Sequence, residues 1–233
     1  MEGPKAETTK AMFSDVAKTY DRANNALTFG LAHKWRKKIV TLADTPKNGA
    51  VLDCATGTGD LAIAFKKTLG KESEVVGQDF CKEMLDFAPQ KAKGKNLDIK
   101  FDLGDVMNLP YEDRSFDTVT IAYGIRNVED PKIGLQEMWR VLKPNGKLLI
   151  LETGEGKGVL NWPITFYTKH LTPLVGGLVT RKKEAYDYLS KSSQKFPSQE
   201  KFLDLGADLP DLKKSYFRTL MFGASYIYVF EKI

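Results

Sequence analysis

Residues 50–62 read Ala-Val-Leu-Asp-Cys-Ala-Thr-Gly-Thr-Gly-Asp-Leu-Ala, and this stretch decides the fold of the chain. It begins with a short apolar run that is typical of a buried parallel strand, and it continues through a loop that carries Gly57 and Gly59. An amphipathic helix begins at Asp60. The glycines let the backbone approach a ligand closely, and the first N–H groups of the helix point toward the same space. This order of elements predicts a nucleotide-binding turn.

The charges around this turn indicate which ligand it binds. Residues 57–62 match the loose Gly-x-Gly-x-x-Ala dinucleotide fingerprint, and Asp79 follows about 20 residues later, where an acid would hold a ribose. However, Asp53 and Asp60 flank the position that a pyrophosphate would take, and like charges at such range repel. We therefore expect S-adenosylmethionine, which carries a cationic sulfonium and amino group, a ribose and an adenine but no phosphate. The structural alternative is that Asp60 only caps a helix and that Asp53 is a solvated strand end.

The composition limits the class of protein. With 233 residues, of which 42% are hydrophobic and 28% charged, the chain suits one α/β domain. We expect a cytoplasmic protein, because no apolar run could cross a bilayer and the first residues do not form a secretory signal. Cys54 and Cys81 fit a reducing compartment and have no metal-ligand spacing, so no metal is predicted. The net charge of +5 permits attraction to nucleic acid or to anionic lipid.

Strands and helices alternate between residues 50 and 153. This alternation predicts a doubly wound, mostly parallel sheet in one Rossmann-like α/β domain that spans residues 1–233. The predicted strands lie near 50–54, 74–79, 97–103, 116–123 and 146–153, and the predicted helices near 60–69, 82–92 and 131–142. The aromatic and β-branched residues from Tyr216 to Phe230 predict an antiparallel hairpin at one edge, which completes a seven-stranded sheet.

Two additions to the sheet are predicted to be helical. Residues 1–46 form an N-terminal lid, with one amphipathic helix from Ala11 toward Tyr20 and a second from Leu31 to Ala43 that carries a basic flank. Residues 154–205 form an insertion with two apolar, aromatic stretches at 159–167 and 171–180. We expect part of this insertion to cover a lipophilic ligand or to contact a membrane surface. The alternative is a helix that is buried against its own domain.

Candidate cofactor-binding residues gather where the predicted strands end, which is where doubly wound sheets bind their ligands. Asp79 can accept hydrogen bonds from both ribose hydroxyls, and Asp105 is placed to accept one from the adenine amino group. The candidate cofactor-binding residues are Asp53, Gly57, Thr58, Gly59, Asp79, Phe80, Asp105, Val106 and Ala122. For each acid taken alone, a turn or a helix cap is the structural alternative.

Motifs along most of the chain carry a resemblance to a known family. They are residues 51–60, Met12 to Asn24, His33 to Arg36, Asn108 to Tyr111 with Phe116-Asp117, Gly124 to Asn127, Arg140 to Pro144 and Tyr186 to Ser192. Together they resemble the C-methyltransferases of menaquinone and ubiquinone biosynthesis, which are class I methyltransferases. Nucleic-acid amino methyltransferases carry a proline pair and an aromatic residue after the fourth strand, and this chain does not. We therefore expect no nucleic-acid partner.

The resemblance implies transfer of a methyl group from S-adenosylmethionine to a ring carbon of a polyprenylated demethylquinol, with the menaquinone precursor favoured over the ubiquinone one. Such a carbon is nucleophilic only if a phenolic oxygen is deprotonated or polarised. Arg126 is the candidate to stabilise the phenolate and hold a water, and Asn127 the candidate to orient that water. Tyr20 and His33 are further catalytic candidates. The lipophilic substrate implies peripheral association with a membrane surface, and the chain could form a homodimer.

Three other functions stay open. The chain could methylate another small lipophilic or aromatic acceptor. It could instead bind the cofactor without turnover, as a subunit of a biosynthetic complex. A dinucleotide-dependent oxidoreductase is the third, and the carboxylates of Asp53 and Asp60 disfavour it.

Overall fold

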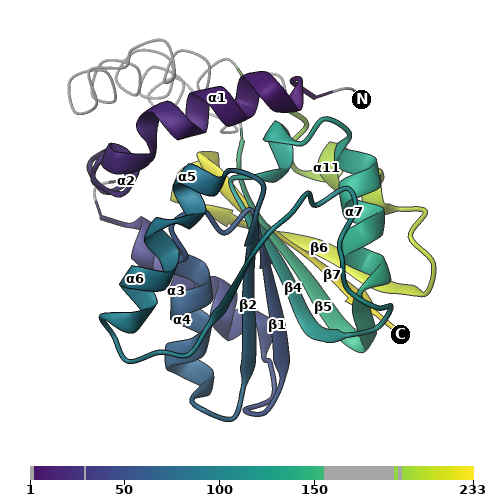
Figure 1. The fold of residues 1–233 in the computed structure, drawn as a ribbon. Coiled ribbons are helices and arrows are strands. Elements are labelled where there is room, and N and C mark those ends of the chain that lie inside the picture. The colour runs from purple at the N-terminus through teal and green to yellow at the C-terminus, as the bar shows by residue number, and fades with distance from the viewer. Residues whose placement is uncertain (1–2, 29, 155–191, 194–195) are drawn as a thin grey trace.

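The computed structural model describes residues 3–28, 30–154, 192–193 and 196–233 (Figure 1). A seven-stranded sheet with the order β3-β2-β1-β4-β5-β7-β6 forms its centre. The strands are β1 (Ala50–Cys54), β2 (Glu74–Asp79), β3 (Lys100–Leu103), β4 (Phe116–Ala122), β5 (Leu142–Thr153), β6 (Leu212–Leu220) and β7 (Ser225–Lys232). The pairs from β3 to β5 are parallel, whereas β7 is antiparallel to both of its neighbours. The predicted fold class and the edge hairpin are confirmed.

Helices cover both faces of the sheet (Figure 1). On one face, α3 (Ala32–Ala43) and α4 (Asp60–Leu69) pack against the sheet through a core that includes Trp35 and Phe65. On the other face, α7 (Pro131–Arg140) and α11 (Glu200–Leu203) pack through Trp139 and Phe202. The crossover helices lie on alternate faces because right-handed connections turn in opposite directions on either side of β1.

The boundaries differ from the sequence prediction at several places, among them β3, which begins at Lys100 rather than near residue 97. The helix predicted over 82–92 consists of α5 (Lys82–Leu85) and α6 (Phe87–Lys93). Pro89 explains the break, because proline lacks an N–H group and its ring clashes with the carbonyl four residues earlier, at Leu85. In addition, β5 begins at Leu142 rather than near residue 146, because Leu142 pairs with Phe116 ahead of a register shift.

The N-terminal helices lie over the edge at which the parallel strands end. They are α1 (Ala6–Val16), which begins earlier than predicted, and α2 (Tyr20–Leu27). In Figure 1, α1 crosses the upper edge of the sheet above α5. Most of the insertion predicted over 154–205 lies outside the described residues, so its role over the acceptor stays a prediction.

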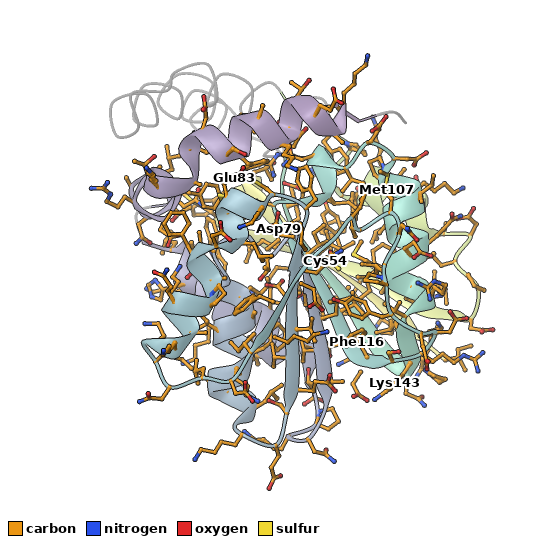
Figure 2. The ribbon with its side chains drawn as sticks, viewed as in Figure 1. Cys54, Asp79, Glu83, Met107, Phe116 and Lys143 are labelled. Carbon is orange, nitrogen blue, oxygen red and sulfur yellow. The ribbon has the colours of Figure 1, made fainter. Side chains whose placement is uncertain are left out.

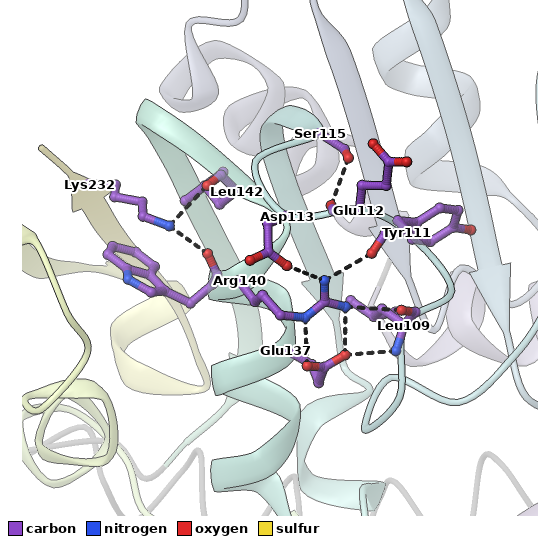
Figure 3. Close-up of polar contacts among 10 residues, drawn as sticks. Leu109, Tyr111, Glu112, Asp113, Ser115, Glu137, Arg140, Leu142 and Lys232 are labelled. Atoms are coloured by element: carbon purple, nitrogen blue, oxygen red, sulfur yellow. Dashed lines mark hydrogen bonds and ion pairs between the residues drawn. The ribbon is translucent and has the colours of Figure 1, made fainter.

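Arg140 holds the loop between β3 and β4 in place (Figure 3). Its guanidinium donates to the backbone oxygens of Leu109 and Tyr111 and to the carboxylates of Asp113 and Glu137. Glu137 in turn accepts from the Leu109 amide at 2.9 Å. The planar guanidinium can serve several acceptors at once, which a lysine ammonium cannot do in this arrangement. The loop that carries Asp105 is therefore fixed to α7.

We expect Arg140→Ala to lower the free energy of unfolding by about 2 kcal/mol, because it removes charge-assisted hydrogen bonds to a loop. Chemical denaturation measures the change. Lys132→Ala is the matched control, since it removes an ion pair to Asp208 in which both side chains are at least half exposed. That change should cost less than about 1 kcal/mol. Equal losses in the two variants would contradict this role of Arg140.

Candidate active site

Two adjoining pockets lie where the parallel strands end. The first encloses about 710 Å³ of space, part of it open to solvent, and the second about 500 Å³. Volumes of this order are typical of small-molecule sites. Both pockets are lined by Tyr20, Ala55, Gly57, Ala122 and Tyr123. The shared lining makes one continuous site with two compartments, roofed in part by the N-terminal helices.

The backbone at the pocket floor has unusual conformations. Ala55 and Tyr123, which follow β1 and β4, have φ values of 47° and 56°, and Gly57 has a φ of 58°. Positive φ is uncommon for residues other than glycine and persists where the surroundings impose it, often at functional sites. Gly124 leaves room for this arrangement, because a Cβ at this position would lie 2.6 Å from the Cβ of Ala55.

Asp79 organises the first compartment. Its carboxylate accepts from the amide of Gly57 at 2.7 Å and from the amide of Cys81 at 2.8 Å. It lines the first pocket at the upper edge of the sheet, below α1 in Figure 2. Burial raises the pKa of Asp79 to about 6, against the opposing effect of these hydrogen bonds. Asp79 therefore holds the glycine loop and still offers acceptor positions to a ligand.

Asp53 has a different role from the solvated strand end considered as its alternative. It is 1% exposed, and its two oxygens accept from the hydroxyls of Thr56 and Thr120 and from the amide of Ala62. These contacts brace the glycine loop and the first turn of α4. Burial raises the pKa of Asp53 to about 6. The residue also lines the second pocket.

Asp60 does not present the uncompensated negative charge that the sequence predicts. Its carboxylate forms ion pairs with Arg36 at 2.9 Å and with Lys91 at 2.5 Å, so its negative charge is compensated within the protein. Lys91 also bonds to Asp21 of α2 and to the Thr58 hydroxyl. The sequence around Asp60 does not predict these ion pairs, because Arg36 lies on α3 and Lys91 lies on α6. Repulsion by Asp60 therefore cannot exclude a phosphate-bearing ligand.

Most of the other predicted cofactor-binding residues line one of the two compartments. Phe80, Asp105 and Val106 line the first and Thr58 the second. Asp105 accepts from the Met107 amide with one oxygen, at 2.9 Å. Gly59 lines neither pocket: a Cβ there would lie 2.9 Å from the Cβ of Ala88, which indicates a packing role.

Two buried polar atoms in the first compartment have no partner among the described residues. They are Nε2 of Gln78 and Oδ1 of Asn127, and both residues line this pocket. A buried polar group without a hydrogen bond costs about 1–3 kcal/mol. The wall of this compartment therefore holds one donor and one acceptor that are shielded from solvent and unsatisfied among the described residues.

The four catalytic candidates do not all meet at the site. Tyr20 lines both pockets, Asn127 lines the first, and burial raises the pKa of Tyr20. Arg126 lines neither: its side chain is 7% exposed, and it pairs with the fully buried carboxylate of Glu152. His33 is exposed on α3 and, as far as the structure describes the chain, lines neither pocket.

Two further residues, Tyr123 and Glu152, shape the site and were not among the candidates predicted from the sequence. Tyr123 lines both pockets, and its carbonyl accepts from the side chains of Arg126 and Asn127. Glu152 accepts from Arg126 and from the amide and hydroxyl of Thr153. Glu152 lies near the end of the apolar strand β5, as Asp53 does in β1, and the same pattern could have identified it as a candidate site residue.

The part of the chain that the structure describes contains no cluster of three or more His, Cys, Asp or Glu that could hold a metal ion. None of its described helices is long and apolar enough to cross a bilayer. Cys54 and Cys81 are free and buried.

The fold is that of the class I methyltransferases. A SAM-dependent methyltransferase of Thermotoga maritima superposes with a TM-score of 0.67 at 19% identity, over 97% of this chain and 100% of that chain. One of Aquifex aeolicus superposes with a TM-score of 0.54 at 18% identity, over 85% of this chain and 89% of that chain.

The chain belongs to the ubiE/COQ5 methyltransferase family, which it matches over residues 1–230. It is 49% identical to the ubiquinone/menaquinone biosynthesis C-methyltransferase UbiE of Bdellovibrio bacteriovorus, over 97% of this chain and 96% of that protein. It is 40% identical to the demethylmenaquinone methyltransferase of Deinococcus radiodurans, over 98% of this chain and 94% of that protein. The resemblance seen in the sequence is confirmed, and the protein is a methyltransferase.

Proposed function

We propose that this enzyme transfers the methyl group of S-adenosylmethionine to a ring carbon of a polyprenylated demethylquinol, with demethylmenaquinol as the favoured acceptor. One observation carries the proposal: two compartments share Tyr20, Gly57 and Tyr123, so a donor and an acceptor can meet there. The names of the most similar relatives supply the acceptor class.

The first compartment would hold the adenosine part of the cofactor, which supplies an activated methyl group on its sulfonium, and Asp53 and Thr58 would face its amino-acid part from the second compartment. Asp79 would accept from the ribose hydroxyls, which suits a carboxylate better than a neutral side chain. Asp105 would accept from the adenine amino group with the oxygen that does not bond to Met107, while Phe80 and Val106 pack on the ring. The Nε2 donor of Gln78, which has no partner among the described residues, would lie beside the same ligand.

The remaining chemistry is alignment and removal of a proton from the acceptor. Holding donor and acceptor in line contributes up to ~7–11 kcal/mol to lowering the barrier. Tyr20 and Asn127 face the pockets and would bind the quinol oxygen or the water that takes its proton. Arg126 would act through Tyr123, whose carbonyl it holds at 3.0 Å, and through its positive charge. His33 stays a prediction as a catalytic group.

Cofactor binding should weaken as the pH falls through about 6. The pKa of Asp79 is raised to about 6, and only the ionised carboxylate accepts from both hydroxyls. Because the ligand binds the form without the proton, the dissociation constant is flat above about pH 7 and rises toward tenfold per unit below about pH 6. Calorimetry at about pH 5 and about pH 7.5 measures this. In the Asp79→Asn variant, this rise of the dissociation constant at low pH should be absent. If the dissociation constant of that variant depends on pH as the wild type's does, another group is responsible for the titration.

Two measurements test the proposed function. Calorimetry with S-adenosylmethionine and with NAD should show micromolar binding of the first only. Turnover should then be measured on a panel of demethylquinols presented in lipid vesicles, together with small phenols. We expect methylation of the demethylquinols; turnover on phenols alone would favour another acceptor, and binding of the cofactor without any turnover would favour a binding subunit.

A further inference from the structure

The turn between β6 and β7 presents an exposed aromatic side chain. Phe222 is 68% exposed, more than any other large apolar side chain that the structure describes. Met221 and Phe222 both have positive φ, 45° and 55°, a conformation that bulky residues seldom adopt. The turn is held by bonds from the Ala224 amide to the Met221 carbonyl and from the Gly154 amide to the Ala224 carbonyl. The surrounding structure thus imposes a conformation that places a phenyl ring in solvent.

Two cations lie on the strand that leads to this turn. Lys214, Tyr216 and Arg218 alternate along β6 and therefore share one face. The Lys214 ammonium lies 5.0 Å from the Tyr216 ring centroid, and the Arg218 guanidinium carbon lies 5.5 Å from it. Both cationic residues are exposed, and Glu231 of β7 is in register with Lys214. An amphipathic aromatic ring between two cations suits the polar boundary of a lipid bilayer.

A basic edge of α3 extends the same surface. Tyr216 and Met221 pack against the core cluster to which α3 contributes Trp35. On α3, Arg36 faces α4, where it pairs with Asp60. By helical geometry, the exposed residues Lys34 and Lys38 lie on the flank of α3 away from Arg36. Because α3 packs on β5 with α4 on its other side, this flank faces the β7–β6 side of the sheet.

The surface also adjoins the site. The hydroxyl of Tyr123, which lines both pockets, lies 3.2 Å from the hydroxyl of Ser225, three residues after Phe222. Because β6 and β7 are antiparallel to each other and β7 to β5, their turn lies at the edge where the parallel strands end. A membrane in contact with this turn would lie next to the compartments.

We propose that Phe222, with Lys214, Arg218, Lys34 and Lys38, docks the enzyme on an anionic lipid bilayer at the edge of the sheet where the two compartments lie. The proposal rests on the proposed function, since a polyprenylated acceptor resides in lipid. Phe222 enters the interface, and the four cations face lipid phosphates and anionic headgroups. The apolar, basic character of one face argues for lipid rather than for an acidic protein, which would not need the exposed ring.

The test is sedimentation of the purified chain with vesicles of phosphatidylcholine, with and without phosphatidylglycerol. The wild type should bind the anionic vesicles and release at high salt. Lys214→Gln with Arg218→Gln should weaken partitioning about 25-fold, because each cation near an anionic surface contributes about fivefold. Phe222→Asn should weaken it about tenfold or more, while asparagine tolerates the left-handed backbone.

Matched controls separate this surface from bulk charge and bulk hydrophobicity. Lys71→Gln removes an exposed cation from the turn between α4 and β2, and Ile133→Asn removes a 44% exposed apolar side chain from α7. Both should bind vesicles as the wild type does. If the docking variants and the controls bind equally, or if neutral vesicles bind as well as anionic ones, the proposal is overturned. Vesicle binding that follows the prediction without any quinol turnover would instead contradict the proposed function alone.

Discussion

Replacing Asp79 with alanine should weaken binding of S-adenosylmethionine by roughly 3–6 kcal/mol, or at least about 100-fold. The substitution removes the proposed acceptor of two ribose hydroxyls, each worth about 1.5–3 kcal/mol to a charged partner. It also removes the acceptor of the Gly57 and Cys81 amides, which fix the glycine loop against the pocket. Calorimetric titration with the cofactor measures the loss.

Asp86→Ala is the control for this experiment. Asp86 follows β2 on the same segment, but it is exposed, and within the described part of the chain its ion pair is with Lys82, one helical turn earlier. Its removal should leave the dissociation constant unchanged. Circular dichroism should show both variants folded, because relief of the buried carboxylate, whose pKa is raised, offsets part of the cost of leaving the Gly57 and Cys81 amides without an acceptor. An unchanged affinity in the folded Asp79 variant would remove this residue from the cofactor site.

Arg126→Ala should lower the free energy of unfolding by about 3–5 kcal/mol, because it leaves the carboxylate of Glu152 buried without its cation. The side chains of the pair are 7% and 0% exposed, so water cannot replace the lost partner. Chemical denaturation measures the change, and turnover of the single variant alone would not separate stability from catalysis.

A double variant makes that separation. Arg126→Met with Glu152→Gln removes both charges and keeps the volume similar, so most of the lost stability should return. If Arg126 acts on the reaction through its charge and through Tyr123, turnover should stay low in this stable variant while cofactor binding is near normal. Restored turnover would show that the ion pair is structural only.

The fold could be predicted because local and global signals agree. The apolar run of β1 and the glycine loop each imply a strand or helix boundary, and the alternation of strands and helices leaves few topologies. Two predicted boundaries were wrong for physical reasons that the local pattern does not show. Pro89 divides a helix, and Leu142 extends β5 because it pairs with Phe116 of β4, which is distant in sequence.

The site could be predicted where a residue ends its strand, as Asp79 does, or follows it within three residues, as Asp105 and Val106 do. It could not be predicted where distant helices determine the electrostatics. Lys91 and Arg36 neutralise Asp60, although neither is near it in sequence. In the same way, Glu152 turns Arg126 away from the pockets, and only the packing of β5 against the segment after β4 brings these two residues together.

Analysis of the reaction product tests the central claim most directly. The purified enzyme would be incubated with S-adenosylmethionine carrying a deuterated methyl group and with demethylmenaquinol deuterated on the ring carbon, in anionic vesicles. Mass spectrometry should find one intact labelled methyl group on the ring and loss of the ring deuterium. A methyl group on the phenolic oxygen with the ring deuterium retained, or no transfer by enzyme that binds the cofactor, would contradict the account.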